Sequence, residues 1–428
     1  VIVVRSVDEE DEGTPVTAPA TLESESESPP VSDESSLFRD FALPNPLFAS
    51  DSAWNQTAVS APVLPQSDEQ ILVTFRVLLG DISTLEGYDE PATTWPYMDV
   101  NINDYTIPIF RAGDGMQNVV ICEDEGVLGR PLSQFGIETE GGPVTVPAPA
   151  GAVRPAGPED EDADGHLVLY DADTFTAYDY FAAIIEGQGD CTEFAGGMMG
   201  RRITEAGVVA YFDVRGPGIS PDGESGARAH GTPLLAGLIL PEDIERGEIA
   251  HALAFAIPGP RNLSRDPYEP LPSDYFYPAT TTETDFYNTH PLALAAGQRI
   301  RLQQTLVDEE GDLIDESEFA PITQLFLDAL RNYGAYLVDN AGGFSFYAED
   351  VHTAVLHLSA DEVNALIGRP SGSPLPEDMT KWEMVLETLG NELERIPFAI
   401  SPGDQEPDPK TAAIEVANFE VVAPAVVP

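Results

Sequence analysis

Short runs of alternating apolar and polar residues recur along most of the chain, a pattern typical of half-buried β-strands. The runs expected to form strands are residues 70–77, 99–103, 105–110, 208–214, 252–257, 299–306 and 336–338. Two further runs, 166–170 and 175–180, flank Asp171-Ala172-Asp173-Thr174, a sequence typical of a hairpin turn. With 36 glycines and 38 prolines between them, these strands predict a mainly β body of the β-sandwich or jelly-roll type, without strand–helix alternation.

Three segments instead repeat apolar residues at helical spacing, and each has a recognisable boundary. Residues 322–333 are followed by Gly334, and residues 378–396 place Trp382, Leu386 and Leu393 on one side. A short helix is expected between the capping box Ser359-Ala360-Asp361-Glu362 and Gly368. The body is therefore expected to carry only a few short helices.

Composition divides the chain into an acidic extended arm (1–40), a β-rich body (41–400) and an extended C-terminal strand and tail (401–428). A further boundary within the body is expected at 147–165. The arm begins with the β-prone residues Val1, Ile2, Val3 and Val4 and continues with the acidic run 8–12 and a Ser/Glu/Pro stretch at 24–36. Such a composition buries too little apolar surface to fold alone.

The charge of the chain limits its partners. Its 428 residues include 74 acidic and 20 Lys or Arg residues, a formal net charge of −54. This excludes nucleic-acid binding by phosphate neutralisation and disfavours anionic membrane surfaces. No apolar run reaches the roughly 18 residues of a membrane helix, so we expect no membrane insertion.

Only Lys381 and Lys410 are lysines, and carboxylates dominate the surface-forming residues. This bias is typical of salt-adapted proteins, in which salt screens the self-repulsion. An unusually acidic cytosolic protein is the alternative. The chain begins with Val1, which fits a secreted chain after signal-peptide removal, so we expect an extracellular or cell-surface location.

One candidate calcium loop combines Asp160, Asp162, Asp164 and Asp171, with Gly165 at the sixth position. Ca²⁺ prefers several carboxylate and carbonyl oxygens at this spacing. The alternative is a solvated acidic linker, because the chain is so rich in carboxylates. The run 308–312 is a weaker version of the same pattern.

Cys122 and Cys191 are the two cysteines and allow one disulfide, which an extracellular location permits. Two unpaired buried thiols are the alternative.

No residue pattern indicates catalysis. The six histidines lack zinc-site spacing, and His166 and His251 are expected to be hydrogen-bonded residues at the core or its rim. The chain contains neither a G-x-S-x-G elbow nor a phosphate-binding glycine loop. Two-carboxylate glycosidase chemistry needs only two well-placed acids, so 74 carboxylates neither favour nor exclude it. The balance favours a non-enzymatic protein.

Several stretches resemble secreted bacterial proteins of unassigned activity that often lie beside carbohydrate-binding modules. The similar stretches are 164–171, 231–239, 247–255, 275–279 and 333–340, which together cover under half of the chain. The resemblance implies secretion and a β-rich body, and it brings no catalytic residue with it.

These observations favour a secreted structural subunit of an extracellular filament or surface layer in a salt-adapted bacterium. Its copies would join by strand addition, with Val1–Val4 pairing with a neighbour's sheet. The same segment folding back onto its own sheet is the alternative. The second hypothesis is a secreted polysaccharide-binding or polysaccharide-degrading protein, and a calcium-stabilised adhesin lies between the two.

Overall fold

The computed structural model describes residues 39–88, 96–102, 105–111, 117–121, 144–148, 165–181, 205–206, 208–220, 226–264, 271, 273–282, 286–401 and 409–425. The α-helices are α1 (Ser67–Leu78), α2 (Pro241–Arg246), α3 (Pro321–Asn332), α4 (Ala360–Leu366) and α5 (Lys381–Leu393). The strands are β1 (Leu85–Glu86), β2 (Met98–Val100), β3 (Ile109–Arg111), β4 (Gln117–Ile121), β5 (Val144–Ala148), β6 (Leu167–Asp171), β7 (Thr176–Phe181), β8 (Glu205–Ala206), β9 (Val208–Asp213), β10 (Leu253–Ile257), β11 (Tyr287–Asn288), β12 (Arg299–Leu302), β13 (Ala335–Asn340), β14 (Phe344–Phe346), β15 (Ala399–Ile400), β16 (Val416–Ala417) and β17 (Phe419–Val422).

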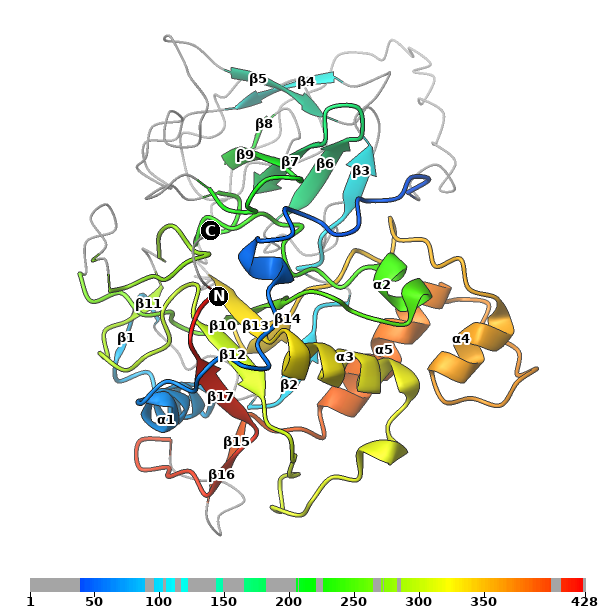
Figure 1. Ribbon diagram of the computed structural model, residues 1–428. Coiled ribbons are helices and arrows are strands. Elements are labelled where there is room, and N and C mark those ends of the chain that lie inside the picture. Colours follow the sequence, from blue (N-terminus) through cyan, green and yellow to red (C-terminus); the bar gives the residue numbers. More distant parts are fainter. Residues whose placement is uncertain are drawn as a thin grey trace, which may run out of the picture.

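A six-stranded mixed sheet with the order β17-β12-β13-β10-β14-β2 lies at the centre of the lower half in Figure 1. Its central strand, β10, is buried along its whole length. Because side chains alternate along a strand, Leu253, Phe255 and Ile257 point to one face, whereas Ala254 and Ala256 point to the other. The two faces therefore carry two different cores.

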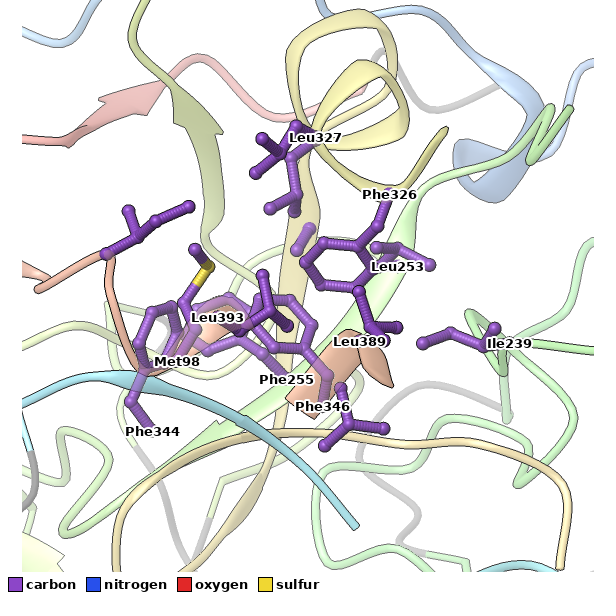
Figure 2. Close-up of a cluster of buried hydrophobic side chains, with 14 of the residues drawn as sticks. Met98, Ile239, Leu253, Phe255, Phe326, Leu327, Phe344, Phe346, Leu389 and Leu393 are labelled. Carbon is purple, nitrogen blue, oxygen red and sulfur yellow. The ribbon is translucent and has the colours of Figure 1, made fainter. Parts of the chain in front are cut away.

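The first core lies between this sheet and helices α3 and α5 (Figure 2). Phe326 of α3 packs edge-on against Phe346 of β14 at 5.0 Å between ring centroids. Phe344 makes similar edge contacts with Phe255 and Phe398. These rings are fully buried, so each contributes roughly 2–3 kcal/mol of apolar burial.

The second core lies between the other face of the six-stranded sheet and a four-stranded sheet with the order β3-β6-β7-β9. The small side chains of Ala254 and Ala256 let Val168 and Tyr170 of β6 contribute to this core. Residues 231–240 are buried, and Leu235 and Leu238 belong to this second core.

The fold is β-rich with few helices, as expected, but its sheets are mixed. Strands β10 and β13 are parallel, but the chain between them contains β12 of the same sheet as well as α3, so their connection is not a simple strand–helix–strand unit. A β-sandwich or jelly-roll strand order is not confirmed. The hairpin predicted around 171–174 is confirmed by β6 and β7, and the three predicted helices correspond to α3, α4 and α5.

Residues 70–77 were expected to form a strand but lie in helix α1. Ile71, Phe75 and Leu78 are buried at helical spacing, so the segment carries an apolar stripe and not a strict alternation. Acidic residues in its first turn and Arg76 in its last turn complement the helix dipole.

The C-terminal segment supplies an integral strand of the main sheet. Strand β17 pairs with β12 over four residues, and its other edge contacts residues 62–67, for example through the Leu64 N–H bound to the Val421 carbonyl at 2.9 Å. In the described ranges, no helix is long and apolar enough to cross a membrane.

Candidate functional site

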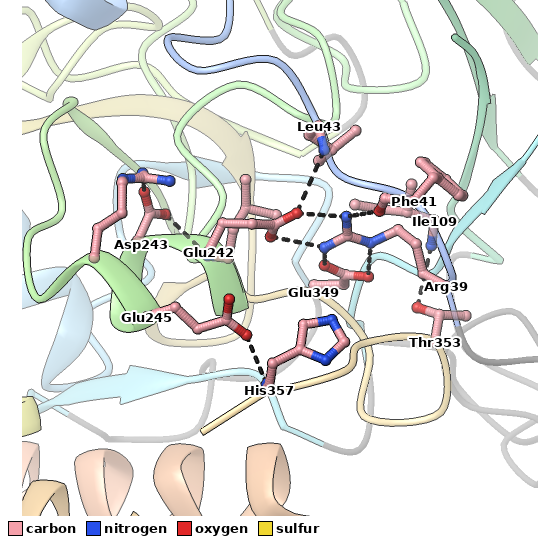
Figure 3. A network of polar contacts seen from close by, with 12 residues as sticks. Arg39, Phe41, Leu43, Ile109, Glu242, Asp243, Glu245, Glu349, Thr353 and His357 are labelled. Carbon is pink, nitrogen blue, oxygen red and sulfur yellow. Dashed lines mark hydrogen bonds and ion pairs between the residues drawn. The ribbon is translucent and has the colours of Figure 1, made fainter. Parts of the chain in front are cut away.

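Helix α2 carries the acidic residues Glu242 and Asp243 in its first turn. It begins with Pro241, whose fixed φ suits a first helical position, and it ends at Gly247, which has a φ of +72°. Asp243 accepts a hydrogen bond from the Leu240 N–H at 3.2 Å, and this bond caps the helix. Glu242, in the same turn, points toward Arg39 of the segment 39–43 (Figure 3).

Arg39 joins Glu242 to Glu349, and these three residues form what we term the arginine clasp (Figure 3). Nε and Nη2 of Arg39 donate to the two carboxylate oxygens of Glu349 at 2.8 and 2.7 Å. Its Nη1 and Nη2 donate to Glu242 at 2.6 and 2.8 Å, and Nη1 also donates to the Phe41 carbonyl at 2.7 Å. All five N–H groups of the guanidinium therefore have an acceptor.

The clasp is almost completely shielded from solvent. Only 3% of the Arg39 side chain and none of the Glu349 side chain is exposed, whereas Glu242 keeps 22%. Burial raises the pKa of Glu349 to about 7, although the charge and hydrogen bonds of Arg39 act in the opposite direction. For Glu242, burial also favours the neutral form, but Arg39 more than offsets it and the pKa lies below its ordinary value.

A second pair lies on the other side of α2. Asp243 is buried, and one carboxylate oxygen lies 3.1 Å from Nε2 of His251 while the other pairs with Arg246. Nδ1 of His251 lies 3.0 Å from the Ala252 carbonyl. Burial lowers the pKa of His251, but Asp243 and the Ala252 carbonyl outweigh it and the pKa lies above its ordinary value.

A small pocket lies between residues 43–48 and the side chains of Glu242, Asp243 and His251. Its walls are residues 43–48, Trp54, Asn55, Leu235, Gly237, Leu240, Glu242, Asp243, Arg246, Ala250 and His251. The cavity has about 30 Å³ of free space, room for roughly two water molecules.

This arrangement holds segments together and offers little for catalysis. A general base needs one nitrogen facing a substrate, whereas both nitrogens of His251 face acceptors of the protein. Both carboxylates of the clasp are engaged by Arg39. We therefore assign the site a structural role in fixing residues 39–43 to the body.

A further buried charged group lies between the two sheets. Arg228 donates through Nη1 to the Pro233 and Ala236 carbonyls at 3.0 and 2.9 Å, and its guanidinium lies 4.7 Å from the ring centre of Tyr347. Asp179 of β7 accepts from the Leu234 N–H at 2.6 Å. Burial raises the pKa of this carboxyl to about 7. Both side chains hold the segment 228–236 between the sheets.

Most of the residues singled out from the sequence lie outside the described residues: Asp160, Asp162, Asp164, Cys122, Cys191 and Val1–Val4. Asp171 is described, and its carboxylate accepts from the N–H groups of Asp173 and Thr174 at 2.9 and 3.2 Å, which closes the hairpin turn. In the weaker acidic patch, Asp308 likewise accepts from the Asp312 N–H at 2.9 Å. In the described part of the chain, no group of three or more His, Cys, Asp or Glu residues is arranged to hold a metal ion.

Two histidines lie as expected. His166 is buried with Nε2 3.2 Å from the Ala227 carbonyl, and His251 lies at the rim. The clasp residues were not identified from the sequence. Their only signal was an arginine at the end of a strongly acidic arm and an acid, Glu349, that follows the apolar run Phe346-Tyr347-Ala348.

With this geometry in hand, comparisons of the chain with protein-family models, with characterised proteins and with solved structures found no match.

Proposed function

We propose that the protein is a secreted structural subunit whose copies assemble, in salt, into an extracellular filament or surface layer through the segment 1–38. The observation that carries the proposal is the buried attachment of Arg39, which fixes the C-terminal end of that segment on a folded body. The 38 residues that precede Arg39 can span on the order of 120 Å when extended, which is enough to reach a neighbouring copy.

Three further observations support this role. Val1–Val4 is a β-prone run joined to the body by an acidic stretch that cannot fold alone. In contrast, the C-terminal strand β17 is already paired within its own chain, so the N-terminal side is the better candidate donor. The body presents two sheets around a common core, and in the described residues no strand pairs with the outer edge of β9, a six-residue strand at the end of its sheet.

The test is deletion of residues 1–38, which keeps Arg39 and the rest of the body. The deletion variant is expected to remain folded and monomeric under high-salt conditions in which the full chain forms filaments or sheets, as seen by negative-stain electron microscopy. A variant with four serines in place of Val1–Val4 tests the strand itself, and a scrambled 24–36 stretch is the matched control. Normal assembly of the deletion variant, or single particles of the full chain at every salt concentration, would overturn the proposal.

A further inference from the structure

Residues 39–43, which we term the strap, attach to the body through a compact set of contacts at their two ends. Besides the clasp, the Arg39 N–H donates to the Thr353 carbonyl at 2.7 Å, and the Leu43 N–H lies 3.4 Å from Glu242. Phe41 stacks on Tyr170 of β6 with 5.8 Å between ring centroids. The strap therefore bridges the four-stranded sheet and α2 without being a strand of either sheet.

The surface that receives Arg39 is an acidic notch made by Glu242 and Glu349. Glu242 is placed by the first turn of α2. Glu349 is held from behind, because its carbonyl accepts from Nε1 of Trp382 on α5 at 2.8 Å and its N–H donates to the Ile239 carbonyl at 3.0 Å. Two carboxylates fixed in this way recognise the planar fork of a guanidinium far better than the point charge of a lysine.

The strap is followed by a short proline-containing connection, Pro44-Asn45-Pro46. Asn45 and Pro46 are exposed, and the chain is fixed again at Phe48, whose N–H donates to the Val214 carbonyl at 2.6 Å. The connection also forms one wall of the small pocket. A change in its course would therefore disturb little packed structure, and a short stiff hinge of this kind favours exchange of the segment before it.

We infer that the acidic notch is a docking site for the arginine strap of a second copy of this chain. The inference rests on the proposed function, because exchange of the strap would carry residues 1–38 onto the neighbouring copy, where they complete the contact that joins the copies. The strap without these residues is not expected to hold the copies together. Exchange would reproduce every strap contact between chains and would alter only the course of Pro44-Asn45-Pro46, because the Leu47 carbonyl is held by the Asn55 side-chain amide at 2.9 Å. Each copy has one strap and one notch, so exchange that is not reciprocal passes from copy to copy and builds a filament.

The test is complementation between two variants. Arg39→Ala removes the docking arginine but keeps the notch, whereas Glu242→Gln with Glu349→Gln weakens the notch but keeps the arginine. Each variant alone is expected to remain monomeric in native mass spectrometry at high salt. Their mixture is expected to give a heterodimer at twice the monomer mass, because the strap of the second variant fills the notch of the first.

A mixture that contains only monomers would overturn the inference, provided that both variants are folded by circular dichroism. If Arg39→Ala does not fold alone, recovery of folded heterodimer on mixing supports the inference, and failure to recover it overturns it. A mixture in which the notch carrier instead bears Arg39→Lys is the matched control, because its own lysine fills the notch poorly and should permit partial exchange.

The result is separable from the proposed function. Filaments of the wild-type chain without a heterodimer in the mixture would leave the structural role intact and refute the strap as the joining contact. A heterodimer without wild-type filaments would leave the docking site intact and refute the structural role.

Discussion

At the scale of single residues, the most informative group is Glu349, because its shifted pKa makes the free energy of unfolding depend on pH. Burial raises its pKa to about 7 from an ordinary 4.5, so near pH 7 this carboxyl is only partly ionised in the folded protein, whereas it is fully ionised in the unfolded chain. Its contribution to stability is therefore full below pH 4.5 and is lost as the pH rises through 7. Glu349→Gln, which cannot ionise, is expected to remove this loss, so its free energy of unfolding should fall clearly less than that of the wild type between pH 5 and 8.

Urea unfolding at pH 5 and pH 8 measures the difference. Glu242→Gln is the matched control: the pKa of Glu242 is lowered, so its contribution is lost only as the pH falls below its ordinary value. That variant should keep most of the wild-type fall between pH 5 and 8, reduced by the repulsion that Glu242 adds to Glu349. An equal fall in wild type and Glu349→Gln would contradict the assignment.

Two glycines with the same backbone conformation distinguish the cost of backbone strain from the cost of a steric clash. Gly237 and Gly247 have φ angles of +71° and +72°. A Cβ at Gly237 would overlap the backbone nitrogen of Ala254 in β10, whereas a Cβ at Gly247 meets nothing within 4 Å. Gly247→Ala is therefore expected to cost about 1 kcal/mol of unfolding free energy from backbone strain alone. Gly237→Ala should cost more than about 3 kcal/mol or prevent folding, because β10 is packed on both faces. Similar melting temperatures for the two variants would show that residues 231–240 are not held against β10.

At the scale of elements, local signals in the sequence were sufficient where they were complete within a short stretch. The hairpin around Asp171 and the helices α4 and α5 each carry their own turn or capping residues, and they were predicted correctly. Helix α1 was mistaken for a strand because its β-branched residues Ile71, Val73 and Val77 are typical of strands. The clasp was beyond prediction, because Arg39 and Glu349 are 310 residues apart and only the fold brings them together.

The caps of α5 give an element-scale prediction. The Thr380 hydroxyl accepts from the Glu383 N–H at 3.0 Å, and the Glu383 carboxylate accepts from the Thr380 N–H at 3.1 Å. Helix α5 covers the first core, so fraying of its first turn loosens Trp382, which is fully buried. Thr380→Ala is expected to lower the free energy of unfolding by about 1 kcal/mol. Thr388→Ala, in the middle of the same helix, is the control and should change it by less than about 0.5 kcal/mol. Equal effects of the two substitutions would show that the cap does not stabilise the helix.

At the scale of the whole molecule, the net charge of −54 opposes both folding and assembly, but in different ways. Within one copy, salt relieves repulsion among the carboxylates of the body, so the melting temperature is expected to rise from 0.1 to 1 M NaCl as the screening length falls from about 10 to 3 Å. Sucrose, which is uncharged, should not reproduce the ionic part of this rise. A melting temperature that falls with NaCl would contradict the argument.

In the proposed assembly, the acidic run 8–12 would approach a neighbouring copy that is itself strongly acidic, so we expect assembly to require screening as well. Replacing the five acids of this run with their amides is expected to lower the NaCl concentration at which filaments appear in light scattering. The melting temperature should keep most of its salt dependence, since only five of the 74 acidic residues are changed. Because the two measurements respond to different charges, a shift in both together would show that the acidic segment acts on the folded body and not on the contact between copies.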